Sequence, residues 1–338
     1  MTGRRPAGAA PDGPRAAPVG AGRPRVLVLR ALGLGDLLAG VPALRALRRA
    51  FGGYEIVLAA PRELAGAASA SGAVDTLLPA RAPGRAVPPA LAWTGPPPEV
   101  AVDLHGNGPP SHRLLQGLRP GRLLAFAHPG TPEIQGPVWR ADEHERARWC
   151  RFLEWYGIPA DPADLRLAPP GAPCPAPGAV VVHPGADSGA RRWPAERYAA
   201  VAGELRGHGY RVVLTGGPGE DGLLARVAGP AGLDRVDVLA GGLPFGELAA
   251  LFAGAAAVIS GDTGIAHLAV AYGTPSVTLF GPVPPDLWGP PPGTRHVALW
   301  HPGPPGDPHG REPDPRLLRI QPEDVLKALL DHPEVARP

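Results

Sequence analysis

The chain has 338 residues, 44% of them hydrophobic, which is enough for two ordinary domains that each bury a core. Its formal net charge of +2 argues against a nucleic-acid-binding protein, and its few aromatic residues do not form a stacking platform for bases. The 47 Gly and 48 Pro residues would suggest disorder in an aperiodic chain. However, much of the Pro lies in a few stretches, and the segments between them keep clear hydrophobic periodicity. We therefore predict a folded two-domain protein with Pro-rich loops.

The ends of the chain and its cysteines bear on its location. Residues 1–24 contain no apolar stretch, which predicts a disordered tail rather than an export signal. No run reaches the roughly 18 uncharged apolar residues of a membrane span. Cys150 and Cys174 have neither metal-ligand spacing nor a disulfide framework, which favours a reducing compartment. We expect a cytoplasmic monomer with at most peripheral contact with a membrane.

The first half of the chain alternates between strand and helix patterns. Apolar runs predict strands at 25–30, 54–60, 73–78, 99–104 and 122–126. Helical patterns follow the first strand through Ala50 and recur at 62–70, 111–117 and 142–156. Residues 79–98 form a low-complexity, Pro-rich loop. Repeated βαβ units indicate a parallel sheet with helices on its faces, so residues 25–157 form a Rossmann-like N-terminal domain.

A second series of the same kind follows residues 158–178, whose seven prolines mark a linker. Strands are expected at 179–183, 210–214, 236–239, 255–259 and 276–280, and helices at 194–207, 220–228, 245–253 and 264–272. A Pro-rich excursion spans 281–315. Residues 179–320 are therefore a second Rossmann-like domain. A helix at 321–331, within the C-terminal segment 321–338, could pack back on the first domain.

The first chemical candidate is Gly33-Leu34-Gly35-Asp36, directly after the first strand. A dinucleotide fingerprint would need a third Gly where Leu38 stands and an acidic residue where the second strand ends in Ala59-Ala60-Pro61. A phosphate-binding P-loop fails as well, because the chain has no Gly-Lys-Ser/Thr sequence. What remains is a carboxylate at a glycine turn. Asp36 is either a general base or the N-cap of its helix.

The second candidate is the turn Ser260-Gly261-Asp262-Thr263-Gly264 between a strand and a helix. Asp262 stands where an N-cap is expected, and Thr263 and Gly264 would begin the helix with exposed backbone N–H groups. Such a terminus suits a phosphate, although any βα turn also prefers small and capping residues. His267, one turn into the helix, could reach a phosphate oxygen or be structural.

Two further strand ends carry candidate side chains. The segment from His183-Pro184-Gly185 leads to Arg191-Arg192-Trp193-Pro194, where the two arginines are either phosphate ligands or an exposed pair on a loop. The turn Thr215–Glu220 ends in an acidic residue. Glu220 could bind ribose hydroxyls or be a favourable charge in the first turn of its helix.

The pattern D-T-G-x-x-H-L-A-x-A-x-G-x-P-x-x-x-L-F-G-P, from Asp262 to Pro282, resembles the signature of glycosyltransferase family 9, the ADP-heptose:lipopolysaccharide heptosyltransferase family. The resemblance covers about residues 25–331. It implies the GT-B architecture, in which two doubly wound Rossmann-like domains face a cleft. It also implies inverting transfer of a sugar, a heptose above all, from an ADP-activated donor to an acceptor hydroxyl. No cofactor is implied. A metal site is not expected either, because the chain has no D-x-D triplet or carboxylate cluster.

The resemblance also assigns roles to individual residues. Gly35-Asp36, followed by Pro42-Ala43-Leu44, matches the family's opening, in which the Asp is the proposed general base. The resemblance implies donor-binding roles for Gly35, Arg191, Arg192, Glu220, Leu243, Asp262, Thr263, Gly264 and His267. Among these, Glu220 would hold the ribose and Leu243 would line the adenine pocket. The family's usual Lys is Arg in this chain, and which of the two arginines faces the diphosphate stays open.

The acceptor is not identified by any motif. Its site is expected near residues 105–112, and it could be a glycan, a lipid-linked glycan or a small-molecule glycoside. Two other functions are compatible with the same pattern. One is a nucleotide-sugar hydrolase or epimerase of the same fold, and the other is a nucleotide-sugar-binding protein without catalytic activity.

Overall fold

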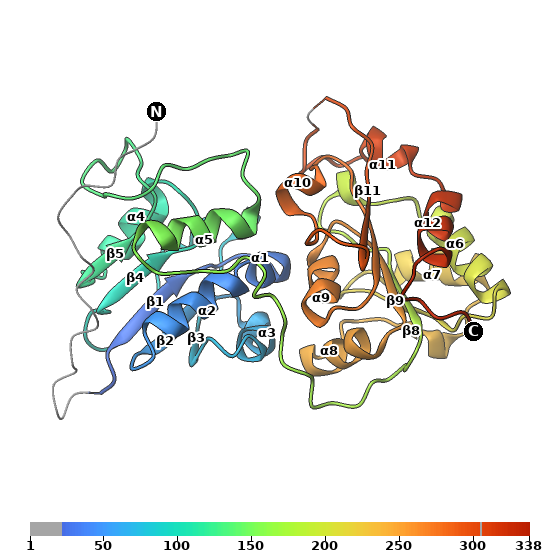
Figure 1. Cartoon of the computed structure of the whole chain (residues 1–338), viewed down its shortest axis with the longest axis horizontal. Helices are drawn as coiled ribbons and strands as arrows, with labels where there is room; N and C mark the ends of the chain where they lie inside the picture. Colours follow the sequence, from blue (N-terminus) through green and yellow to red (C-terminus); the bar gives the residue numbers. More distant parts are fainter. Residues whose placement is uncertain (1–21, 305) are drawn as a thin grey trace. The chain divides into compact units, whose positions relative to one another are not determined.

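The computed structural model describes residues 22–304 and 306–338, and most of the tail predicted for residues 1–24 lies outside them. The chain divides into two compact units, Met1–Leu165 and Arg166–Pro338, and the division falls inside the predicted linker range 158–178. Each unit consists of one parallel sheet with its helices (Figure 1). The two units are described separately below.

The sheet of the N-terminal unit has the strand order β3-β2-β1-β4-β5, and all four pairings are parallel. Its strands are β1 (Arg25–Leu29), β2 (Glu55–Ala60), β3 (Thr76–Pro79), β4 (Val100–Asp103) and β5 (Arg122–Leu124). Its helices are α1 (Leu34–Ala39), α2 (Val41–Ala50), α3 (Ala65–Ala70), α4 (Pro109–Gln116) and α5 (Glu145–Trp155), with short 3₁₀ turns η1 (Arg62–Leu64) and η2 (Pro83–Arg85). The central strands are mostly apolar, apart from charged residues at their ends, because helices cover both faces of the sheet.

The helix predicted to run through Ala50 is two helices, α1 and α2, which meet at Gly40. A Cβ atom at Gly40 would lie 2.9 Å from Nε of Arg30, so only glycine fits beside this buried side chain. Pro42 occupies the first turn of α2, where a missing N–H costs no helical hydrogen bond. Hydrophobic periodicity alone continues across this break and does not reveal it.

The sheet of the C-terminal unit has the order β11-β10-β9-β6-β7-β8, again entirely parallel. Its strands are β6 (Val180–His183), β7 (Val212–Thr215), β8 (Val238–Leu239), β9 (Ala257–Gly261), β10 (Ser276–Leu279) and β11 (His296–Leu299). Its helices are α6 (Ala195–Gly207), α7 (Asp221–Ala231), α8 (Phe245–Gly254), α9 (Gly264–Tyr272), α10 (Pro285–Trp288), α11 (Pro315–Arg319) and α12 (Pro322–Leu330), with 3₁₀ turns η3 (Gly189–Arg191) and η4 (Arg235–Asp237).

Both sheets are doubly wound. The chain starts at a central strand, builds one side of the sheet, and then crosses to the other side. The crossing points lie between β1 and β4 and between β6 and β9. Loops diverge at the carboxyl ends of such strand pairs, which is where ligands bind in open α/β sheets. Asp36, Arg191 and Asp262 follow three of these strands, β1, β6 and β9, whereas Glu220 and Leu243 follow β7 and β8.

The predicted excursion 281–315 contains more structure than the sequence indicated. It includes α10 and the edge strand β11, which pairs in parallel with β10. Later in the same stretch, Ala190 donates to the carbonyl of Gly310 at 2.9 Å, and Asp314 donates to the carbonyl of Ala190 at 3.2 Å. Four strand residues inside a Pro- and Gly-rich stretch are too short a signal to identify, because they are stabilised by pairing with β10.

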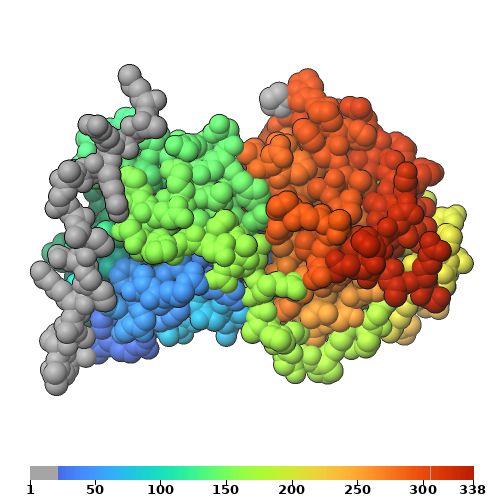
Figure 2. All heavy atoms as spheres, viewed as in Figure 1, coloured from blue at the N-terminus to red at the C-terminus, as the bar shows by residue number. Residues whose placement is uncertain are grey.

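The last helix packs within its own unit. We noted that it could pack on the first domain, but α12 contacts α6, β10 and β11. Its Val325 and Leu329 join the buried core of the C-terminal unit, together with Leu317 and Ile320 just before it. The end of the chain, red in Figure 2, lies on the surface of this unit.

Two adjacent leucines on α11 test this packing. Leu317 is 0% exposed and Leu318 is 37% exposed. We expect Leu317→Ala to lower the free energy of unfolding by about 2–5 kcal/mol, because it leaves a cavity in the core. Leu318→Ala should change it by less than about 1 kcal/mol. Urea unfolding measures both, and helix propensity cancels between them. Equal midpoints for the two variants would contradict the packing.

Candidate active site

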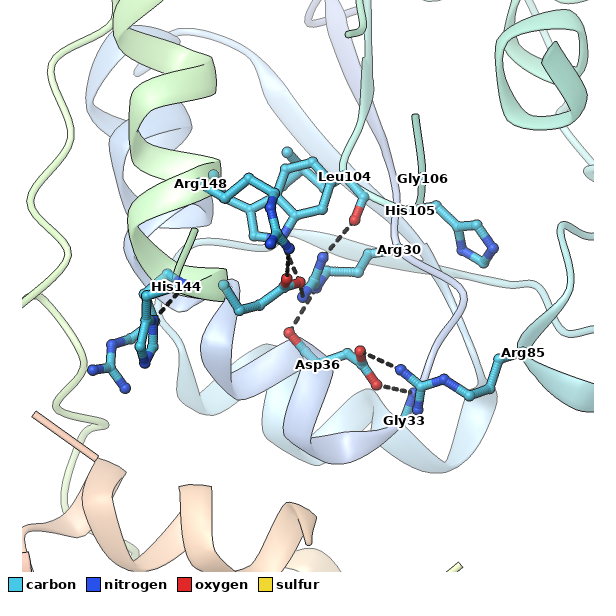
Figure 3. Close-up of polar contacts among 12 residues, drawn as sticks. Arg30, Gly33, Asp36, Arg85, Leu104, His105, Gly106, His144 and Arg148 are labelled. Atoms are coloured by element: carbon cyan, nitrogen blue, oxygen red, sulfur yellow. Dashed lines mark hydrogen bonds and ion pairs between the residues drawn. The ribbon is translucent and has the colours of Figure 1, made fainter. Parts of the chain in front are cut away.

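Asp36 is held from two sides at the start of α1 (Figure 3). It is 4% exposed and is the third residue of the helix, whose N-cap is Gly33. Its Oδ2 accepts a hydrogen bond from the Gly33 N–H at 3.1 Å, and its Oδ1 lies 2.6 Å from Nη2 of Arg85. Asp36 is therefore not the N-cap, although its carboxylate satisfies the N-cap's backbone donor. The carboxylate has a fixed orientation at the carboxyl end of β1.

A buried ion pair supports the backbone beneath Asp36. Arg30, which follows β1, is 1% exposed, and its Nε donates to the backbone carbonyl of Asp36 at 2.6 Å. Its other nitrogens donate to the carbonyl of Leu104 and, at 3.1 Å, to Oε1 of Glu145. Glu145 also accepts from the indole N–H of Trp149 at 2.6 Å. One guanidinium thus ties together the ends of β1 and β4, helix α1 and helix α5.

His105 lies next to this group, at the carboxyl end of β4. Its Nδ1 accepts from the backbone N–H of Ala31 at 3.2 Å, and its ring also hydrogen-bonds the backbone of Ala86. Burial lowers the pKa of His105 to about 4, and the positive charge of Arg30 contributes. The imidazole is therefore neutral at pH 7. It connects the turn after β1 with the loop that carries Arg85.

Asp103 and His112 form a buried pair behind the same loop. Asp103 accepts from the N–H groups of His105 at 3.0 Å and Gly106 at 3.2 Å, which shapes the turn after β4. Its Oδ2 lies 3.8 Å from Nε2 of His112, and neither of these two atoms has a hydrogen-bond partner. Burial raises the pKa of Asp103 to about 6 and lowers that of His112 to about 4. Both side chains are fully buried, so they shape the loop from within.

In the C-terminal unit, the turn between β9 and α9 gathers several predicted donor residues. The N-cap of α9 is Thr263, whose hydroxyl accepts from the Ile265 N–H at 3.3 Å, and the helix begins at Gly264. The prediction that Asp262 is the N-cap is therefore wrong. Asp262 instead directs its carboxylate to Arg191, with 3.3 Å between Oδ2 and Nη1. The local sequence pattern could not show whether Asp262 or Thr263 is the N-cap, because the Asp262 carboxylate is taken up by Arg191, which is distant in the sequence.

The two adjacent arginines have different partners. Nη1 of Arg191 also donates to the backbone carbonyl of Asp262 at 3.4 Å, and its buried Nε has no hydrogen-bond partner. Nε of Arg192 donates to the carbonyl of Ala186 at 2.9 Å, within the same loop. Arg191 therefore faces the start of α9, whereas Arg192 braces its own loop. Sequence alone left this choice open.

The ends of β6 and β7 meet at Glu220. Its Oε2 accepts from the Gly217 N–H at 2.7 Å, and a Cβ atom at Gly185 would lie only 2.3 Å from its carboxylate oxygens. Nδ1 of His183 lies 3.1 Å from the hydroxyl of Thr215, and burial lowers the pKa of this histidine. The Pro-Gly-Ala turn after β6 thus has no side chain at Gly185 because the Glu220 carboxylate occupies that space.

The other predicted donor residues lie at separate places. His267, on α9, has its ring edge-on to Trp288 of α10, with the ring centroids 5.9 Å apart. Leu243 lies half-buried between β8 and α8. Gly35 lies in the N-terminal unit, beside Asp36 on α1. Sequence reasoning missed Trp288, Arg30 and Arg85. Trp288 and Arg85 lie within Pro-rich stretches, and Arg30 donates to Leu104 and Glu145, which are 74 and 115 positions away.

Within residues 22–304 and 306–338, none of the helices combines the length and apolar character needed to cross a membrane. In the same described part of the chain, no three His, Cys, Asp or Glu side chains gather in a way that could hold a metal ion.

Comparison with known proteins places this geometry in a family. The model described as glycosyltransferase family 9 (heptosyltransferase) matches residues 141–308, which include Arg191, Glu220 and the β9–α9 turn. A relative along most of the chain is lipopolysaccharide heptosyltransferase 1 of Salmonella typhimurium, which is 28% identical over 78% of this chain and 90% of that protein. This chain belongs to glycosyltransferase family 9.

Two other comparisons show how far the likeness extends. The family 9 chain is 37% identical to lipopolysaccharide heptosyltransferase 3 of Escherichia coli, but over only about a third of each protein, 33%. The solved structure of E. coli ADP-heptose lps heptosyltransferase II matches with a TM-score of 0.71 at 19% identity, covering 91% of this chain and 98% of that one. This structural likeness and the two doubly wound sheets confirm the predicted GT-B fold class.

The contact between Gly185 and Glu220 in this family 9 chain can be tested with two glycines. We expect Gly185→Ala to lower the free energy of unfolding by about 1–3 kcal/mol, because the added methyl group must displace the carboxylate. The control is Gly222→Ala on α7, where a Cβ atom would meet nothing within 4 Å. This control should be neutral or stabilising by up to about 1 kcal/mol, since Ala is a better helix former. Urea unfolding separates the variants, and a neutral Gly185→Ala would disprove the contact.

Proposed function

We propose that this chain transfers a heptose from ADP-heptose to an acceptor hydroxyl with inversion at the anomeric carbon. The observation that carries the proposal is the β9–α9 turn, where the guanidinium of Arg191 faces the N-terminus of a helix in a family 9 chain. The donor is supported by the structural relative from E. coli, an ADP-heptose heptosyltransferase. Asp36, buried at a glycine turn in the other unit, supplies a carboxylate suited to a base.

The β9–α9 turn has the charge distribution that a departing diphosphate requires. The N-terminus of α9 carries the positive end of the helix dipole, and Arg191 adds a full positive charge. Asp262 holds the Arg191 guanidinium in place. The buried Nε–H of Arg191 has no hydrogen-bond partner and could donate to a phosphate oxygen. Fixed donors of this kind stabilise negative charge as it develops on the leaving group. Glu220, with Leu243, fits the ribose and adenine roles implied by the resemblance.

Asp36 is the proton acceptor in the proposed reaction. The acceptor oxygen attacks the anomeric carbon as the bond to the diphosphate breaks, and its electron pair leaves with ADP. The hydroxyl proton passes to the Asp36 carboxylate. A general base has to reach that hydroxyl directly or through one water, on the face opposite the leaving group. Inversion, independence from metal ions and a cytoplasmic monomer are predictions of the same proposal, and the names of the relatives favour a lipopolysaccharide glycan as acceptor.

Replacement of the base tests the mechanism. We expect Asp36→Asn to lower kcat/KM by about a hundredfold or more, because general-base catalysis contributes at least this much. Asparagine keeps the size and can still accept from Gly33 N–H. ADP release from ADP-heptose, with a heptose-free lipopolysaccharide core as acceptor, measures the rate. Calorimetry should give an unchanged affinity for ADP. Activity within a few fold of the native level would disprove the role of Asp36, and ADP release that needs no acceptor would indicate a hydrolase.

The two arginines test the donor site. Charge-assisted hydrogen bonds contribute about 1.5–3 kcal/mol, so Arg191→Ala should weaken ADP binding roughly 10- to 100-fold. Arg192→Ala is the matched control, since its guanidinium braces Ala186. We expect the ADP affinity of this variant to stay within about threefold of the native value. The variant loses a contact within the loop, but it keeps the phosphate ligand. Isothermal calorimetry with ADP measures both. A larger loss for Arg192→Ala would reverse the assignment.

A further inference from the structure

We propose that Arg85 is a positioning residue that occupies Oδ1 of Asp36 until an acceptor hydroxyl takes its place, and so keeps the base from activating water. The inference rests on the proposed role of Asp36 as the general base. Arg85 then helps to determine whether the acceptor hydroxyl or water reacts with the sugar donor.

The contact itself covers the reactive atom. Nη2 of Arg85 lies 2.6 Å from Oδ1 of Asp36, while Oδ2 already accepts from the Gly33 N–H (Figure 3). The Asp36 side chain is 5% exposed, whereas that of Arg85 is 46% exposed. The guanidinium is therefore the solvent-facing partner of a buried carboxylate. A nucleophile that gives its proton to Oδ1 has to compete with this donor.

The two arginines that contact Asp36 differ in how easily they can move. Arg30 is fully buried and paired with Glu145. It donates to the backbone carbonyl of Asp36 and not to the carboxylate. Removal of one partner from such a buried pair is strongly destabilising, because it leaves an uncompensated buried charge. In the pair of Arg85 with Asp36 the cation is 46% exposed, so water screens the attraction and can replace the carboxylate as its partner. Arg30 is thus a permanent support, whereas Arg85 can be displaced by a ligand.

The loop that carries Arg85 is built to present this side chain. Gly84 and Arg85 both adopt left-handed backbone conformations, with φ of 61° and 62°. For a residue other than glycine this conformation is uncommon and sterically unfavourable, and it recurs at turns and functional sites. The next residue, Ala86, is anchored by a hydrogen bond to the His105 ring and by its own N–H to the carbonyl of Pro83 at 3.1 Å. The loop therefore keeps the guanidinium beside Asp36.

The charges around Arg85 favour its return to Asp36. The one ion pair that Arg85 makes among the described residues is with Asp36. The nearby His105 is neutral, because burial lowers its pKa to about 4, and Arg30 is already paired with Glu145. Arg81, also in this loop, pairs with Glu63 instead. Without an acceptor, Asp36 is thus the counter-charge available to Arg85.

The chemistry explains why this contact would discriminate between nucleophiles. In the wasteful reaction, water attacks the anomeric carbon, the bond to the diphosphate breaks with its electron pair leaving on ADP, and one water proton goes to Asp36. The products are free heptose and ADP. A single water replaces only the hydrogen bond at Oδ1. A polyhydroxylated acceptor can donate one hydroxyl to Oδ1 and offer other oxygens to the guanidinium, so its binding energy can drive the exchange.

The experiment measures ADP release from ADP-heptose alone, with no acceptor present. If Arg85 keeps Asp36 from activating water, Arg85→Ala should raise the rate of this hydrolysis about tenfold. This increase is smaller than the rate enhancement that a general base can provide. The rise should vanish in the double variant Asp36→Asn/Arg85→Ala. Arg85→Lys should stay near the native rate because it keeps the positive charge. Arg81→Ala is the matched control, since this loop arginine is 75% exposed and pairs with Glu63, and it should change nothing.

The outcomes separate this inference from the proposed function. Hydrolysis by Arg85→Ala that equals or falls below the native rate, with an unchanged melting temperature, would overturn the role of Arg85. A rise that persists in the double variant would show that Arg85 does not act through Asp36 and would overturn it as well. If the native protein fails to bind ADP, or if Asp36→Asn retains full transfer, the proposed function fails and the inference fails with it.

Discussion

The candidate residues of the N-terminal unit depend on one buried charge. Arg30 lies at the end of the central strand β1 with no access to water, and a guanidinium there is tolerated only when its donors are satisfied. Its partners are Glu145 and the backbone carbonyls of Asp36 and Leu104, which come from three different elements. The direction of α1, and with it the Asp36 carboxylate, follows from this arrangement. The same side chain requires a glycine at position 40, which divides α1 from α2.

Both units place candidate groups at the point where the winding of the sheet reverses, but the groups at these two points differ in charge. In each sheet the winding reverses beside the first strand, and the functional groups stand at the carboxyl ends there. The N-terminal unit places a carboxylate at this point, in Asp36. The C-terminal unit places the start of α9 there, with the positive end of the helix dipole, beside Arg191, whose guanidinium is paired with the Asp262 carboxylate. A sugar transfer needs both, a base for the acceptor proton and a cationic environment for the diphosphate.

Two Pro-rich stretches that resemble featureless loops in the sequence carry specific contacts. Residues 79–98 contain Arg85, whose left-handed backbone directs its side chain to Asp36. Residues 281–315 contain the strand β11 and a segment that hydrogen-bonds Ala190, next to Arg191. Proline restricts the unfolded chain, so a Pro-rich loop can hold a polar group in place at a lower entropic cost, whereas glycine permits the left-handed conformation at Gly84. High Pro content in this chain therefore marks rigid loops as well as linkers.

The sequence by itself determined the fold class and the family, and it predicted the chemical types of the candidate residues. Alternating apolar strands and helices required parallel sheets, and the motif from Asp262 to Pro282 indicated the family and its phosphate-binding turn. It did not determine which residues meet. Arg30 and Glu145 are 115 positions apart, Asp36 and Arg85 are 49 apart, and Arg191 and Asp262 are 71 apart. Local patterns record propensity and burial, whereas these pairs exist only once the sheets have brought strand ends together. Tertiary structure likewise places Arg191, rather than Arg192, beside the start of α9, because Arg191 pairs with Asp262, which follows another strand, while Thr263 caps the helix.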